Sequence, residues 1–407
     1  MSKKNNIQFN IEDSAVCQKC FDRIYKTPER KRNAKIRIIH DNEKCSICDN
    51  LLLHEDKIYQ LILKKLHMLK VEFNTFLIAC QVTSDTINRN EKNIYKLIGY
   101  KGKDSLKRQI RRDIGLMIEN KLNKEAEFKF PEIVILIKIR KKRFDFVPFE
   151  EIANVNVFID LNPMYIEGKY RKLVRDIPQT KWPCYTCKGK GCPDCNFTGQ
   201  QYADTVEGLI SKPLLKLTRG DDVKFHGSGR EDIDVRMLGN GRPFVIEVKH
   251  PYSRNINLKF LRRLVNSHSD GKIEIHDLKF VDKERKATIK NSSVESYKVY
   301  AAIAEFDKGL TSEDIQKIED LKKIEQRTPN RVDHRRADII RTRVIKDLSV
   351  KRINSKKLCL TIKCQGGLYI KELISGDNGR TNPSLSSITN SKAVCTQLDV
   401  LEVHIPK

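Results

Sequence analysis

The sequence predicts an α+β fold: an α/β part in the N-terminal half, followed by a larger part built on a largely antiparallel sheet. Helical and strand patterns alternate over residues 50–180, whereas candidate strands outnumber candidate helices after residue 200. The 12 cysteines are the third observation, because eight of them fall into four Cys-x-x-Cys pairs. Such pairs are typical of small metal-stabilised segments.

The charge balance indicates a polyanionic partner. Lys and Arg number 78 against 53 Asp and Glu, which gives a formal net charge of +25. Nucleic acid is the partner that best explains this excess, with a basic proteome or a membrane surface as the alternatives. No apolar run approaches the roughly 18 residues of a membrane span, and the N-terminus lacks the apolar core of a signal peptide. We therefore expect a cytoplasmic protein with no membrane partner, whose cysteines are reduced or metal-bound.

Two Cys-x-x-Cys pairs near the N-terminus predict a structural zinc site. Cys17 and Cys20 form the first pair, and Cys45 and Cys48 form the second. Four thiolates complete a tetrahedral zinc shell and leave no open position for a substrate, so the metal is expected to be structural. A redox pair is the alternative.

The alternating part of the chain predicts an α/β unit. Apolar residues have helical spacing over residues 58–69, and a strand is expected over 73–79. Asp104 can cap a second helix over residues 106–118. The basic run over residues 138–143 suits phosphate contacts, although a charge run is more often a solvated face. Further strands are expected over residues 133–139 and 155–159.

A second and more compact cysteine set follows in the stretch CYTCKGKGCPDC. It comprises Cys184, Cys187, Cys192 and Cys195. Its spacing leaves open whether the four thiolates hold their own zinc or share metals with the first set, and a structural site joining the two halves of the chain is the preferred interpretation. The stretch is also similar to the zinc modules of certain chaperones. The isolated cysteines, expected to be ordinary core or surface residues, are Cys80, Cys359, Cys364 and Cys395.

The remainder of the chain predicts a single α+β domain. A helix is expected over residues 258–266. Strands are expected over residues 244–248, 273–281, 299–306, 358–363 and 398–404.

The stretch GSGREDIDVRMLGNGRPFVIEVK, residues 227–249, is the strongest candidate for an active site. Alternation over residues 234–238, an Asn-Gly turn over 239–243 and an apolar run over 244–248 predict a hairpin. Asp232 then lies where a loop meets a strand, and the glycines let a large ligand approach the backbone.

The arginines of this stretch favour a phosphate-bearing ligand. Arg230, Arg236 and Arg242 offer planar forks that match phosphate oxygens. One carboxylate among arginines and glycines indicates catalysis on a polyanion, and an exposed acidic hairpin in a basic protein is the simpler alternative.

The stretch also resembles a known family. Its residues 229–232 (Gly-Arg-Glu-Asp), continued by 234–236 and 239–244, are similar to those of the tRNA pseudouridine synthases that act on uridines 54 and 55 of the TΨC loop. Gly-Arg-x-Asp alone is similar, more loosely, to the catalytic motif of other pseudouridine synthases. Further similar segments are residues 166–173, 297–302, 326–338 and 368–383.

The resemblance implies a domain order. It is strong over residues 160–407 and loose over residues 15–160, where the β, α, β order resembles a THUMP domain, an RNA-binding module of tRNA-modifying enzymes. The chain is thus expected to comprise a zinc-binding segment, a THUMP-like domain, a four-cysteine linker and a pseudouridine synthase domain. Their expected limits are residues 1–55, 56–180, 181–200 and 201–407.

The resemblance also implies roles for individual residues. Asp232 would be the catalytic carboxylate, either as a nucleophile or as the base that starts glycal formation. Tyr300 would pack against the target uracil, and Arg230 would fill the space that the flipped base leaves. A nearby cation, Lys371 or Arg380, would keep Asp232 ionised. The other residues expected to line the pocket are Ile370, Lys371 and Leu398, with Leu401 as the alternative to Leu398.

The expected partner is tRNA, bound by a monomer. The implied chemistry requires no cofactor, and zinc is expected only as a structural metal. Uridine 54, uridine 55 or both remain open as the target.

Two other functions compete. Asp234, Glu247 and Lys249 have the spacing of many Mg²⁺-dependent nucleases, in which two carboxylates hold the metal and a lysine activates water. A non-enzymatic, zinc-stabilised RNA-binding or chaperone protein would explain the charge and the cysteines, but it leaves the stretch around Asp232 without a purpose.

Overall fold

The computed structural model describes residues 15–25, 36–40, 43–83, 85–97, 104–140, 155–291 and 296–404. The chain divides into two compact units, residues 1–163 with 250–254, and residues 164–249 with 255–407. Each unit has its own hydrophobic core. The domain limits at residues 55, 180 and 200 stay predictions.

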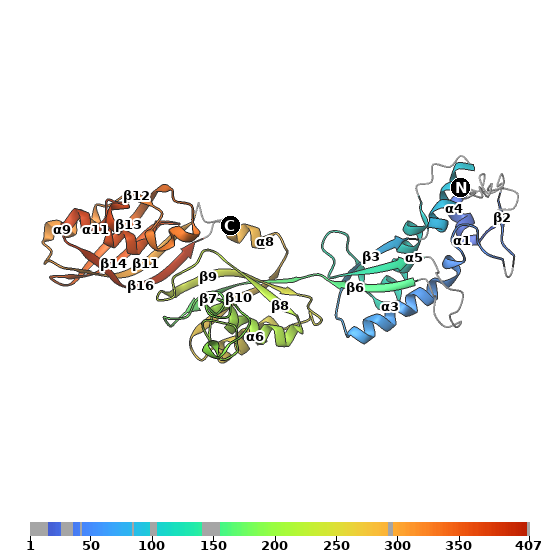
Figure 1. The fold of residues 1–407 in the computed structure, drawn as a ribbon, viewed down its shortest axis with the longest axis horizontal. Coiled ribbons are helices and arrows are strands. Elements are labelled where there is room, and N and C mark those ends of the chain that lie inside the picture. Colours follow the sequence, from blue (N-terminus) through green and yellow to red (C-terminus); the bar gives the residue numbers. More distant parts are fainter. Residues whose placement is uncertain are drawn as a thin grey trace. The chain divides into compact units, whose positions relative to one another are not determined.

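The first unit is built on a four-stranded sheet with the order β4-β3-β5-β6 (Figure 1). Strand β3 is parallel to β4 and β5, and β6 is antiparallel to β5. Helices α3 and α5 contact each other and the sheet. Their bounds are α3 Glu55–Leu69, β3 Thr75–Val82, α5 Leu106–Leu122, β4 Glu125–Ala126, β5 Ile133–Ile139 and β6 Val155–Leu161.

The helices and strands predicted in this region are confirmed, with two differences. The N-cap of α5 is Ser105, whose side chain accepts a hydrogen bond from the backbone N–H of Arg108, so the prediction that Asp104 caps this helix was wrong. Asp104 instead pairs with the Arg108 side chain. Helix α4 (Asp85–Leu97) was not predicted. Residues 141–143 of the basic run lie outside the described residues.

The N-terminal cysteines belong to the core of this unit. Strands β1 (Ala15–Val16) and β2 (Arg37–Ile38) pair in parallel, and α1 (Gln18–Ile24) follows β1 directly. All four cysteines are buried in one cluster with apolar residues of α3 and α5.

The second unit contains a ten-stranded sheet with the order β10-β7-β9-β16-β11-β14-β13-β12-β15, and β8 pairs with β9 off this path. Among its described pairings only β9 with β16 is parallel, so the largely antiparallel sheet is confirmed. The strands are β7 Met164–Lys172, β8 Asp222–Gly227, β9 Arg236–Lys249, β10 Ile273–Val281, β11 Tyr297–Phe306, β12 Lys323–Arg327, β13 Ile340–Asn354, β14 Lys357–Gln365, β15 Thr381–Asn382 and β16 Ala393–His404.

Helices pack beside several of these strands (Figure 1). Helix α7 contacts α6 and β10, α9 contacts α11 and β13, and α10 contacts β16. In the described part of the chain, no helix combines the length and the apolar character needed to cross a membrane. The helices are α6 Val206–Thr218, α7 Leu258–His268, α8 Arg285–Asn291, α9 Ser312–Glu319, α10 Ile370–Ser375 and α11 Leu385–Thr389.

The predicted hairpin around the Asn-Gly dipeptide is wrong, because β9 runs through residues 236–249 without reversing. Gly239 and Gly241 adopt positive φ angles of 56° and 76° inside the strand. Tyr170 of β7 faces Arg242, whereas Lys172 faces Met237, so β9 advances by five residues while β7 advances by two. Gly239 and Gly241 therefore form a bulge within the strand rather than a turn between two strands.

Strand β7 brings most of the family-like segment, residues 166–173 of this chain, into the large sheet. It pairs antiparallel with β9 on one side and with β10 on the other. Its last residue, Lys172, thereby lies beneath the loop that carries Asp232.

Candidate active site

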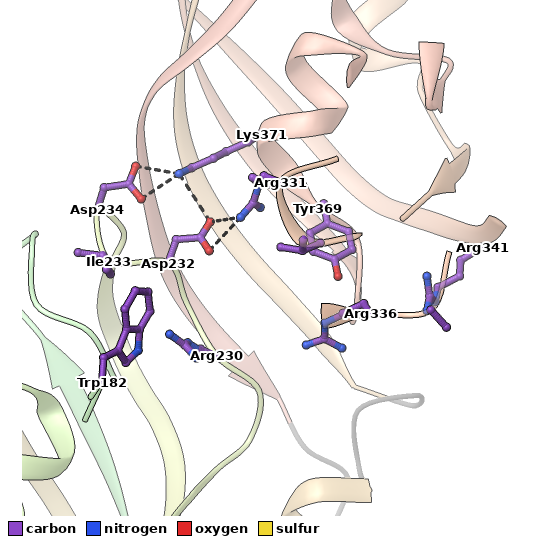
Figure 2. A pocket seen from close by; sticks show the side chains of 12 residues that line it. Trp182, Arg230, Asp232, Ile233, Asp234, Arg331, Arg336, Arg341, Tyr369 and Lys371 are labelled. Atoms are coloured by element: carbon purple, nitrogen blue, oxygen red, sulfur yellow. Dashed lines mark hydrogen bonds and ion pairs between the residues drawn. The ribbon is translucent and has the colours of Figure 1, made fainter. Parts of the chain in front are cut away.

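Asp232 lines a cavity of about 610 Å³ in the second unit (Figure 2). Five cationic side chains and two carboxylates line this cavity, so it favours an anionic ligand. The cations come from three separate segments: Arg230 from the loop before β9, Lys371 from α10, and the rest from residues 331–341. The complete lining is Trp182, Arg230, Asp232, Ile233, Asp234, Arg331, Val332, Arg336, Ala337, Arg341, Tyr369 and Lys371.

The loop between β8 and β9 turns two neighbouring carboxylates in opposite directions. The Glu231 side chain is 0% exposed and pairs with the guanidinium of Arg242, with Nε to Oε2 at 2.8 Å. The hydroxyl of Tyr170 also donates to Glu231, at 2.8 Å. The Asp232 side chain is 32% exposed and faces the cavity. A buried anchor thus fixes the loop, and the next residue presents its carboxylate to the ligand.

The ammonium group of Lys172 binds the backbone of this loop. Its Nζ donates to the carbonyls of Ile177 at 2.9 Å, Asp232 at 3.1 Å and Ile233 at 2.9 Å. Burial lowers the pKa of Lys172 to about 8, and the negative charge of Glu231 partly opposes this shift. Lys172 is therefore a positioning residue. In the sequence it was identified only as a member of the family-like segment, residues 166–173.

Two cations flank the Asp232 carboxylate (Figure 2). Arg331 lies 2.9 Å from it through Nη1, and Lys371 lies 3.6 Å from it through Nζ. A second carboxylate anchors each cation: Glu372 accepts from Nε of Arg331 at 2.6 Å, and Asp234 accepts from Lys371 at 2.8 Å. Burial raises the pKa of Asp234, but the hydrogen bond and charge of Lys371 and the charge of Arg331 lower it, and the net shift is downward.

Arg331, rather than Arg380, is the second cation beside Asp232. The guanidinium of Arg380 donates to the carbonyl of Thr328 and to Asp338, both away from Asp232. The prediction that Lys371 provides a nearby cation is confirmed by its 3.6 Å distance to Asp232, whereas Arg380 as its alternative was wrong. Arg331 was missed because its segment is rich in arginine and gave no sign of which one turns inward.

Three residues expected at the pocket lie in the core. Tyr300, Ile370 and Leu398 are buried members of the large apolar cluster and are absent from the cavity lining. Tyr369 lines the cavity instead, with the guanidinium of Arg331 5.8 Å from its ring centroid. Contact of Tyr300, Ile370 and Leu398 with a substrate base stays a prediction.

The residues of the nuclease alternative do not form a metal site. Glu247 accepts from Lys286 at 3.0 Å and contacts His226 at 3.1 Å, whereas Lys249 pairs with Asp222 at 2.6 Å. Asp234 is engaged by Lys371. Among the described residues, the groups able to hold a metal are the two cysteine clusters.

Each cysteine set forms a separate cluster that fits a tetrahedral metal. Within each cluster the four sulfur atoms lie within 4.8 Å of one another. The sulfurs of Cys17 and Cys48 are 3.7 Å apart, and those of Cys184 and Cys192 are 3.9 Å apart. A tetrahedron with Zn–S bonds of about 2.3 Å has edges of about 3.8 Å, whereas a disulfide requires about 2.05 Å. The donor set and spacing therefore fit two zinc sites rather than disulfides.

Two family models match the chain. Residues 165–404 match the model described as Pus10, C-terminal, and residues 60–138 match the model described as Pus10 THUMP domain, archaeal. The first match covers the large sheet and the Asp232 cavity, and the second covers most of the α/β unit.

Full-length relatives are similar to the chain as well. A protein of Methanosphaera stadtmanae is 66% identical over 407 residues, which is 100% of both chains. A protein of Pyrococcus furiosus is 34% identical and covers 97% of this chain and 96% of its own. Both are named tRNA pseudouridine synthase Pus10. A solved Cbf5-Nop10-Gar1 complex contains a chain with 13% identity and a TM-score of 0.33, over 58% of this chain and 48% of that one.

Proposed function

The chain belongs to the Pus10 family of tRNA pseudouridine synthases, and we propose that it isomerises uridine 54, uridine 55 or both in the TΨC loop of tRNA, with Asp232 as the catalytic carboxylate. The observation that carries the assignment of the residue is the position of Asp232 in a cavity rich in arginine, between Arg331 and Lys371.

The reaction breaks the C–N glycosidic bond of uridine, rotates the base and forms a C–C bond. Its reacting atoms are inaccessible in a stacked nucleotide, so the base must be extruded into a pocket. An ionised carboxylate can then attack the nucleoside covalently or remove the sugar proton that starts glycal formation. Of the two carboxylates that line the cavity, Asp232 is the one paired with both Arg331 and Lys371.

The five cations of the cavity have three proposed roles. Arg331 and Lys371 each pair with Asp232 and with a second carboxylate, so they orient Asp232 in the cavity. Arg336 and Arg341 also line the cavity and suit the phosphates on either side of an extruded nucleotide. Arg230, whose guanidinium lies 5.1 Å from the Trp182 ring centroid, would fill the space that the base leaves.

The cysteine clusters hold zinc in this proposal, and the metal has a structural role. Neither cluster includes a residue that lines the Asp232 cavity. Four thiolates per site leave no open coordination position, so the zinc would stabilise the surrounding loops without touching the nucleoside.

The test is isomerisation in the absence of free metal. Unmodified tRNA transcript is incubated with the purified protein in EDTA, and pseudouridine is mapped chemically at each position. Pseudouridine at position 54, 55 or both is the expected result. Strand cleavage that requires Mg²⁺, or stable binding with no modified base, would instead support the nuclease or the binding protein.

A further inference from the structure

The second cysteine cluster exposes two large aromatic side chains. Tyr185 is 81% exposed and Phe197 is 75% exposed. Phe128 is the one other aromatic residue in the described ranges with comparable exposure. Aromatic rings bury large apolar areas when they gain a partner, so two of them on one short loop mark a contact surface.

The loop that carries these rings is closed and held at its base. The backbone N–H of Cys184 donates to the carbonyl of Gly199 at 2.8 Å, and that of Gln201 donates to Trp182 at 2.9 Å. Phe197 has a φ of 60°, a conformation that is costly for a bulky residue. The Phe197 ring therefore projects from a backbone that the cluster constrains.

The charge around the rings suits a nucleic acid. The ammonium of Lys188 lies 4.3 Å from the centroid of the Tyr185 ring, and Lys190 of the same loop is exposed. Asp194 is the single acidic residue between Cys184 and Gly199. A ring next to an ammonium group offers a stacking surface for a base together with a partner for its phosphate.

The loop starts at the edge of the active-site cavity. Trp182, two residues before Cys184, lines the cavity together with Arg230 (Figure 2). Three residues of chain span at most about 11 Å, so the backbone of Tyr185 lies within that distance of the backbone of Trp182. Nucleotides next to one held in the cavity are therefore within reach of the loop.

We propose that Tyr185 and Phe197 are stacking platforms for unpaired tRNA nucleotides that flank the nucleotide in the Asp232 cavity, and that Lys188 binds a phosphate between them. Extrusion of one nucleotide unstacks its neighbours, and aromatic side chains stabilise unstacked bases without reading their sequence. This inference rests on the proposed function, because it takes tRNA as the ligand. Separate rings interspersed with lysines favour RNA over a protein partner, which would favour a continuous apolar face.

The salt dependence of binding separates stacking from charge. Affinity of the full-length, zinc-loaded protein for fluorescently labelled, unmodified tRNA transcript is measured over a range of salt concentrations. Tyr185→Ala and Phe197→Ala should each weaken binding about 5–150-fold with an unchanged salt slope, because a lost stacking contact releases no counterions. Lys188→Ala should instead lower the slope by about 1. Tyr185→Phe keeps the ring and should bind as the wild type does.

Two controls keep the test independent of folding. Phe260→Ala removes another exposed ring, on α7, and should leave the affinity unchanged. Ultraviolet crosslinking of the wild-type protein to the same tRNA, followed by mass spectrometry, requires no substitution and should locate nucleotide adducts at Tyr185 or Phe197.

The proposal is overturned if the double variant Tyr185→Ala/Phe197→Ala binds tRNA as tightly as the wild type. It is equally overturned if Tyr185→Phe loses as much affinity as Tyr185→Ala, or if no adduct maps to residues 184–199. Neither measurement needs turnover, so a protein that binds tRNA through these rings but forms no pseudouridine would contradict the proposed function alone.

Discussion

The guanidinium of Arg331 lies 2.9 Å from the carboxylate of Asp232, closer than the ammonium of Lys371 at 3.6 Å. The same guanidinium also contacts Glu372 through Nε at 2.6 Å. A planar fork can satisfy both carboxylates at once, so Arg331 fixes the orientation of Asp232 against α10.

Asp232→Asn should abolish isomerisation and leave tRNA affinity nearly unchanged. The amide keeps the shape of the side chain, but it can neither attack the nucleoside nor accept a proton as a carboxylate does. Single-turnover assays and tRNA binding measured on the same preparation check both halves. Wild-type turnover in this variant would remove Asp232 from the mechanism.

Asp234→Asn is the matched control, because it changes the neighbouring carboxylate in the same cavity. It should be milder than Asp232→Asn, since Asp234 contacts Lys371 and acts on the reaction only through that cation. The opposite order of severity would favour the nuclease constellation.

Arg331→Gln should lower the single-turnover rate about 10²–10³-fold, the usual effect of removing one preorganised electrostatic partner. Arg331→Lys should restore little of this loss, because an ammonium group cannot bridge Asp232 and Glu372 together. Arg327→Gln, which breaks an exposed pair with Asp338, is the control and should retain most of the rate. Full activity in Arg331→Gln would show that Lys371 alone suffices.

Turnover and stability should respond in opposite ways when Lys172 loses its proton. Its pKa of about 8 in the folded protein is below the usual 10.5, so between these values the unfolded chain binds the extra proton. This group therefore adds to the free energy of unfolding as pH rises through that window. A neutral amine has two N–H groups for three carbonyls, so the loop loosens and the rate should fall above about pH 8.

Lys172→Met tests this origin of the alkaline limb. The variant should lose about 10²-fold in rate at pH 7, because the backbone of Asp232 and Ile233 loses its donor. The rate of the variant should then show no inflection near pH 8 that belongs to this group. An unchanged inflection would assign it to the substrate or to another residue.

Zinc analysis should find two ions per chain under reducing conditions. Cys17→Ser and Cys184→Ser should each lose one of them, because each disrupts a different cluster. Cys17→Ser should also destabilise the first unit and weaken tRNA binding, while the rate at saturating tRNA changes little. Cys80→Ser, a cysteine of β3 outside both clusters, should keep both ions. A saturating rate that collapses in folded, zinc-depleted protein would place the metal closer to the chemistry.

Binding of tRNA should be strongly sensitive to salt. If about 6–10 phosphates are neutralised, affinity should fall about 10³–10⁵-fold between about 50 and 200 mM monovalent salt. Filter binding across that range measures the slope. A flat response would count against the +25 net charge as the basis of RNA binding.

Local patterns predicted much of this structure. Apolar periodicity located α3, α5, α7 and eight of the 16 strands in the described residues, because each of those signals is contained in a single segment. The Asn-Gly dipeptide led to the wrong prediction of a hairpin, because its flanking glycines form a bulge in a strand that pairs with β7 and β16. Pairing partners far away in the sequence outweigh a local turn preference.

The residues of the cavity also differ in whether local sequence patterns could identify them. Asp232, Arg230 and Lys371 could be placed from motifs, and the structure brings all three into one cavity. Arg331 could not be singled out, since its role depends on contacts with residues 99 and 41 positions away in the chain. Lys172 was equally hidden, because a lysine whose partners are backbone carbonyls leaves no trace in the residue types around it.

The opposite orientations of Glu231 and Asp232 also limit how this loop can evolve. Arg242 holds the side chain of Glu231, and Lys172 holds the backbone carbonyl of Asp232. The chain between these two contacts therefore cannot accommodate a change in length. Inserting or deleting one residue there would turn the buried carboxylate outward and drive the reactive one into the core. We therefore expect natural variation in this loop to consist of substitutions, with its length held constant across species.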